Sequence, residues 1–197
     1  MFAWRGRLHL TPGQQENIGL AVVSARRHGD SYMTRLVFAL ALMGSLTTAA
    51  QAEDVENLPA SIAAKGSAPV AQLQAAGAQI YICAKNAAGA LNWTFREPLA
   101  TLLEEGKTLG RHFVGPTWEF VDGSRVVGEV VSKAPGTTAK DIPWLKLSVK
   151  EPPKSGLVAG ATSVLRIDTK GGVFEGACDS EDELHSEPYS ATYIFVK

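Results

Sequence analysis

The chain has 197 residues, a length that fits one domain, and its 45% hydrophobic and 20% charged residues are typical of a folded globular protein. Its formal net charge is −1, and its lysines and arginines form no basic stripe. Nucleic acids and anionic membrane surfaces are bound largely by neutralising phosphates with clustered basic residues. The composition therefore excludes both as expected partners.

An apolar run of about eleven residues, LVFALALMGSL at 36–46, is the first feature along the chain. Met33 and Arg35 stand just before it, and the sequence Ala-Gln-Ala at 50–52 follows it. A basic start, a short apolar centre and an A-x-A end are typical of a secretory signal peptide, here residues 33–52, with cleavage after Ala52. The run is shorter than the ~20 residues that span a bilayer, so the mature chain is not expected to span a membrane. The alternative is that the run forms a buried helix of the fold.

Residues 1–32 show no clear periodicity, and a signal peptide normally begins near its initiator methionine. We interpret them as an upstream extension that does not belong to the gene product, with Met33 as the true start. Removal of the first 52 residues would leave 14 basic and 18 acidic residues, from 19 and 20 in the whole chain. The expected location of this mildly acidic product is the periplasm or the extracellular space.

Residues 53–76 are rich in alanine, proline and serine, and we interpret them as a surface leader with a short helix around 70–76. From residue 77 to residue 197 the pattern changes to short β-type segments separated by glycine- and proline-containing turns, which predicts one β-rich domain. The expected strands fall at 78–84, 91–95, 98–103, 111–114, 117–121, 125–134, 144–150, 162–169 and 188–197. Eight or nine short strands with little helix predict an all-β fold, either an antiparallel sandwich or a small barrel.

Two cysteines, Cys83 and Cys178, lie in the expected mature domain. An even number of cysteines in an exported chain indicates a disulfide, which here would close a loop of about 95 residues. The alternative is two separate buried thiols. Two cysteines without neighbouring histidines do not suggest a metal site, and no cofactor is expected.

The most distinctive stretch is GRHFVGPTWEFVDGSRVVGEV at 110–130. Four further segments accompany it in order: AQIYICA, IPWLKL, GGVFEGACD and PYSATYIFV. Over residues 58–197 the chain resembles a family of exported bacterial and fungal proteins known as domain-of-unknown-function family 3455. The resemblance implies an exported β-rich domain without an established activity. Some members bear a malate dehydrogenase label, but this chain has no strand–glycine-rich turn–helix unit to support it.

The same stretch supplies the candidate site residues. His112 and Glu119 would converge if the two strands around Gly115-Pro116 brought them together, and an imidazole beside a carboxylate can act as a general base. Trp118, Asp122 and Arg125 are the candidate ligand-binding residues. Each also has a structural interpretation, Trp118 in the core and Asp122 in the turn.

Two further groups of residues have both a functional and a structural interpretation. Trp93, Trp118 and Trp144 could line a sugar- or lipid-binding face, although aromatic residues in strands are usually core. The acidic stretch at 179–187, with His185, could hold a calcium ion, but it lacks ordered ligand spacing, so a solvated loop is favoured.

Without a nucleophile motif, the sequence favours a binding or structural module for an unknown small molecule or glycan. The alternative is a small exported enzyme that uses His112 and Glu119, with or without a metal. The sequence does not indicate an oligomeric state.

Overall fold

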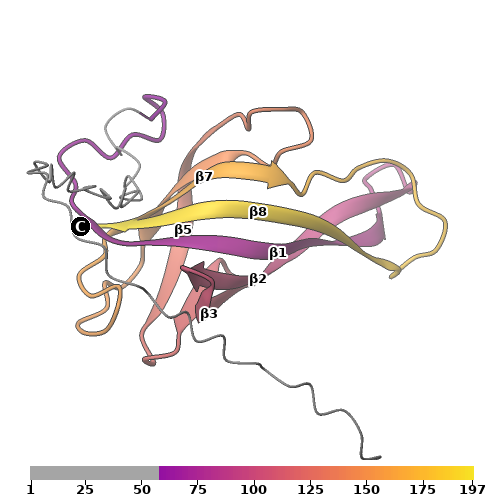
Figure 1. Cartoon of the computed structure of the whole chain (residues 1–197). Coiled ribbons are helices and arrows are strands. Elements are labelled where there is room, and N and C mark those ends of the chain that lie inside the picture. The colour runs from indigo at the N-terminus through magenta and orange to yellow at the C-terminus, as the bar shows by residue number, and fades with distance from the viewer. Residues whose placement is uncertain (1–57) are drawn as a thin grey trace, which may run out of the picture. The chain divides into compact units, whose positions relative to one another are not determined.

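The computed structural model describes residues 58–197, which form eight strands joined in one antiparallel ring (Figure 1). Each strand pairs with the next along the chain, and β8 also pairs with β1, so the sheet closes into a barrel. The predicted all-β class is confirmed, and of the two predicted architectures the barrel is the correct one. The strands are β1 (Pro69–Lys85), β2 (Leu91–Glu104), β3 (Lys107–Phe113), β4 (Thr117–Phe120), β5 (Arg125–Ala134), β6 (Trp144–Val149), β7 (Ser163–Gly171) and β8 (Leu184–Val196). The predicted upstream extension and signal peptide lie outside the described residues.

Along each strand, successive side chains face alternately the inside and the outside of the barrel. In β8, Tyr193 and Phe195 belong to the cluster inside the barrel, whereas Ile194 and Val196 belong to a second cluster on its outside. This follows from strand geometry, in which successive side chains point to opposite faces of the sheet. Both faces of β8 are apolar because both are covered.

The outer cover comes from residues just before β1. Ile62 is completely buried and packs, together with Ala64, against outward-facing residues of β7 and β8. The Lys146 ammonium also donates a hydrogen bond of 2.9 Å to the Ala63 carbonyl oxygen. These residues are therefore a packed part of the domain, and the expectation that they form only a surface leader is wrong for 62–64.

The helix predicted around 70–76 is also wrong, because these residues lie in β1. Gln74 pairs with Leu103 of β2 on one side and with Thr192 of β8 on the other. Alanine-rich sequence favours a helix locally, but hydrogen-bonded partners on both sides override this preference. Near the middle of β1, Gly77 allows close approach of β2, since a Cβ at this position would overlap the Leu99 carbonyl oxygen.

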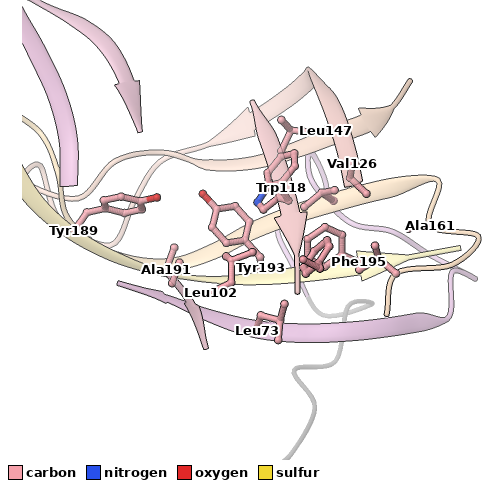
Figure 2. Packing of buried hydrophobic residues seen from close by; sticks show 14 of the residues in the cluster. Leu73, Leu102, Trp118, Val126, Leu147, Ala161, Tyr189, Ala191, Tyr193 and Phe195 are labelled. Carbon is pink, nitrogen blue, oxygen red and sulfur yellow. The ribbon is translucent and has the colours of Figure 1, made fainter. Parts of the chain in front are cut away.

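The interior of the barrel differs between its two ends. At the end formed by the β2–β3, β4–β5 and β6–β7 connections, buried side chains fill the interior, and we call this end the filled half (Figure 2). Phe195 packs there against Phe120, with the ring centroids 5.4 Å apart. Val158 and Ala161, from the β6–β7 connection, are both completely buried there. The opposite end contains a cavity, and we call it the hollow half.

Candidate functional site

The hollow half contains a pocket of about 400 Å³. This volume lies within the range of about 300–1,000 Å³ that is usual for small-molecule sites. All eight strands contribute to its wall, as do the β3–β4, β5–β6 and β7–β8 connections. The wall is mostly apolar, with Trp118, Ile142, Leu145 and Leu147 among its residues.

The pocket opens to solvent through an apolar mouth. Phe95, Val114 and Val130 line the pocket and are each about half exposed, at 50%, 54% and 50% of their surfaces. Exposed apolar side chains that surround a cavity are typical of ligand-binding grooves. Arg96 also lines the pocket and pairs with Glu97 at 3.4 Å.

His112 and Trp118 form the floor of the pocket and are partners on neighbouring strands β3 and β4. Their rings are stacked, with centroids 4.6 Å apart and an interplanar angle of 11°. His112 Nδ1 lies 2.9 Å from the Thr117 carbonyl oxygen, so Nδ1 carries the proton and donates this bond. Burial lowers the pKa of His112 to about 4, with a further lowering by Arg166 that the hydrogen bond to Thr117 opposes. The imidazole is therefore neutral at pH 7 and its Nε2 is a hydrogen-bond acceptor.

Three buried polar groups of the pocket wall have no hydrogen-bond partner among the described residues. They are Gln79 Nε2, Trp118 Nε1 and the Tyr193 hydroxyl, and each side chain is at most 2% exposed. Buried polar groups in folded proteins are nearly always paired, because an unpaired one costs about 1–3 kcal/mol. Such a group in a cavity wall is a position where a ligand can make the missing bond.

Arg166 is a cationic residue of the same pocket wall. It projects inward from β7, where Val164 also faces the interior, and it is the direct cross-strand partner of Tyr193 on β8. Its Nε and Nη2 atoms donate hydrogen bonds of 3.1 and 2.8 Å to the Pro143 carbonyl oxygen. Within residues 58–197 it takes part in no ion pair. The Arg166 charge lowers the pKa of Tyr193, although burial raises that pKa more strongly.

A second hydroxyl extends this polar group. In Figure 2, the hydroxyls of Tyr189 and Tyr193 point toward one another inside the barrel. Burial is the main cause that raises the pKa of Tyr189, so both phenols remain protonated at neutral pH. They can therefore act as hydrogen-bond donors.

The β7–β8 connection closes one side of the pocket and is fixed to β1. Tyr81 donates a hydrogen bond of 2.7 Å to the Gly172 carbonyl oxygen and accepts one of 3.3 Å from the Phe174 amide. The predicted disulfide is confirmed: Cys83 and Cys178 are bonded, with Cα atoms 5.8 Å apart. The wall residue Val173 is therefore held between two attachments to the same strand.

The structure places two of the predicted site residues in the pocket, His112 and Trp118. Glu119 is on the outer face, where it pairs with Arg111 through a 2.7 Å bond from Nε, so His112 and Glu119 do not converge. The reason is alternation: Trp118 faces inward, and its neighbour Glu119 must then face outward.

Asp122 and Arg125 lie away from the pocket. The Asp122 carboxylate accepts hydrogen bonds from the Ser124 and Leu157 amides, of 2.9 and 2.6 Å, in the turn at the filled end. A hydrogen bond from the Ser124 hydroxyl, together with these two, lowers the pKa of Asp122. The Arg125 guanidinium lies 5.9 Å from the centre of the Phe113 ring. Asp122 thus has the structural role that the turn sequence indicated.

The other tryptophans and the acidic stretch form separate groups. Trp93 packs on Phe174 and His185, and Trp144 packs against the outer cluster. Two acidic side chains of the stretch have basic partners, Glu181 with Lys85 at 2.7 Å and Glu187 with His185 at 2.9 Å. Within residues 58–197, no group of three or more His, Cys, Asp or Glu side chains is arranged to hold a metal ion.

Sequence reasoning missed Gln79, Tyr81, Arg166 and Tyr193 as pocket residues. Gln79 could have been noticed, because it is a polar residue in an apolar segment, AQIYICA. Arg166 stands in TSVLRIDT, where apolar residues occupy both faces and alternation does not indicate which face is inside.

The fold and the site define a class of protein: a disulfide-bonded antiparallel barrel with one half filled and a pocket in the other half. The chain belongs to the DUF3455 family, described as proteins of unknown function, whose model matches residues 63–197. Comparison with curated proteins and with solved structures gave no match. In the described part of the chain, no helix is long and apolar enough to cross a membrane.

Proposed function

We propose that this protein is an exported binding protein that holds one small, largely apolar molecule in the hollow half of the barrel. The observation that carries the proposal is the pocket of about 400 Å³, which all eight strands line and whose buried wall includes unpaired polar groups. An eight-stranded barrel has an interior that side chains can fill or that can hold one small ligand. In this barrel, side chains fill the interior of the filled half, and the hollow half has room for one small ligand.

Export is supported by the signal-like sequence at 33–52 and by the disulfide, which persists in oxidising compartments. The proposed location is the periplasm or the extracellular space. The pocket favours a small molecule over a glycan, because its wall is predominantly apolar. A catalytic role for His112 with Glu119 has no geometric support, since the two side chains lie on opposite faces of the sheet.

The test is a titration of the oxidised, purified protein with N-phenyl-1-naphthylamine, a neutral apolar dye whose emission rises in an apolar site. Two neighbouring residues of β5 provide matched variants. Val130 lines the pocket, whereas Val131 does not and is 57% exposed. Val130→Trp should weaken dye binding about tenfold or more, because the indole would occupy the mouth, and Val131→Trp should leave binding unchanged.

Absence of dye binding by the folded wild type would contradict the proposed function. Equal weakening by both variants would contradict it as well, because the dye would then bind at the surface and not in the pocket. Thermal melting of each variant serves as the control for folding.

A further inference from the structure

We infer that the ligand is an amphipathic carboxylic acid whose carboxylate is bound by Arg166 and Tyr193 while its apolar part fills the pocket. This inference rests on the proposed function and names the chemical class of the molecule in that site. It depends on three observations: the charge of the pocket wall, the kind of polar atoms left unpaired, and the position of Arg166 relative to them.

The pocket wall contains two arginines, Arg96 and Arg166, and no aspartate or glutamate. The whole chain has a formal net charge of −1, so this local excess of positive charge does not follow from a basic composition. Arg96 has Glu97 as a partner, whereas Arg166 has no acidic partner within residues 58–197. The Arg166 guanidinium donates to the Pro143 carbonyl oxygen, and its charge opposes the rise that burial causes in the pKa of the neighbouring Tyr193. A guanidinium in the wall of an apolar pocket, without an acidic partner among the described residues, is complementary to an anionic ligand.

The unpaired atoms near Arg166 are hydrogen-bond donors. Trp118 Nε1 can only donate, and the Tyr193 hydroxyl has a proton to donate. The Tyr193 and Trp118 ring centroids are 5.4 Å apart, and Tyr193 and Arg166 are direct cross-strand partners. The two oxygens of a carboxylate accept several hydrogen bonds, and an ionised carboxylate donates none. A carboxylate therefore matches this group of donors.

The rest of the wall selects the remainder of the ligand. Leu145 and Leu147 line the pocket from β6, and the mouth is formed by half-exposed apolar side chains. A molecule with a carboxylate at one end and a hydrocarbon body would bury the body against these residues and reach Arg166 with the head. A neutral molecule of the same shape would leave the guanidinium without an anion.

The experiment compares octanoate with octanol, which have the same chain length, in displacement of the naphthylamine dye and in calorimetric titration at pH 7. Wild-type protein should bind octanoate at least tenfold more tightly than octanol. Arg166→Gln should remove most of this preference by weakening octanoate binding about tenfold, with octanol changed less than threefold. Arg111→Gln is the matched control, because Arg111 lies on the outer face and pairs with Glu119.

Tyr193→Phe gives a second variant that removes a single buried hydroxyl of the pocket wall, and it tests the inference even where Arg166→Gln fails to fold. It should weaken octanoate binding several-fold and leave octanol binding unchanged. Equal affinity for the two compounds, or an octanoate affinity that neither variant lowers, would overturn the inference. Dye binding without any octanoate binding would overturn the carboxylate assignment alone, whereas loss of dye binding too would contradict the proposed function.

Discussion

The filled and hollow halves of the barrel are built from the same strands but contain different side chains. In the filled half, the inward residues are large and apolar, such as Leu73, Phe120 and Phe195, and the β6–β7 connection adds Val158. In the hollow half, the same alternation places polar residues inward, among them Gln79 and Arg166. One half therefore stabilises the fold, and the other leaves volume and unpaired donors in the interior. Functional sites commonly lower stability in this way.

The largest expected difference between the halves comes from one substitution made in each. Phe195→Ala should lower the free energy of unfolding by about 3–5 kcal/mol, because Phe195 is completely buried and a cavity would remain. Phe95→Ala should lower it by no more than about 1 kcal/mol, since Phe95 is half exposed at the mouth and its main aromatic contact is the Tyr81 ring, 5.9 Å away. Urea unfolding of both variants measures the two values. Similar losses at the two positions would show that the halves do not differ in packing.

Loss of the disulfide should affect the two halves unequally, because the bridge lies in the hollow half. It links residues 95 positions apart, so its loss should lower stability by about 2–4 kcal/mol through the added entropy of the unfolded chain. In a Cys83→Ser, Cys178→Ser double variant, amide hydrogen exchange should accelerate most in the β7–β8 connection and least around Phe195. Uniform acceleration of exchange throughout the barrel would show that the disulfide does not stabilise the hollow half more than the filled half. Two titratable thiols in the wild type would contradict the disulfide itself.

The stability of the protein should also depend on pH through His112, which lies in the hollow half. Burial lowers the pKa of this imidazole from 6.5 to about 4, so the unfolded chain binds a proton more readily than the folded one between these pH values. The corresponding stability is fully present above pH 6.5 and is lost as the pH falls toward 4, by about 3 kcal/mol at most. The melting temperature of wild-type protein should fall over this range, and His112→Gln should show a smaller fall. Identical pH profiles for the two proteins would show that His112 is not responsible.

The smallest expected effect is a gain in stability. Gln79→Met removes a buried amide whose Nε2 has no partner among the described residues and keeps a side chain of similar length. Stability should rise by up to about 1 kcal/mol, because an unpaired buried polar group is unfavourable. The denaturation midpoint measures the change. A loss of 2 kcal/mol or more would mean that the Gln79 amide supports the fold and does not belong to a ligand site.

The sequence alone was sufficient to predict the all-β class, most strand positions, the turn at Asp122 and the disulfide between Cys83 and Cys178. These features depend on local properties: alternation with a period of two, turn-forming residues and an even number of cysteines. It also drew attention to His112 and Trp118, which face the pocket as partners on adjacent strands.

Three features were apparent only from the folded chain: the closure of the barrel, the inward position of Arg166 and the separation of His112 from Glu119. Closure depends on pairing between β1 and β8, which are more than 100 residues apart at Gln74 and Thr192. Arg166 lies in a strand that is covered on both faces, because Ile62 and Ala64 pack on its outer side. Alternation alone does not indicate which face of such a strand is inside. That choice depends on long-range register, which the local sequence does not specify.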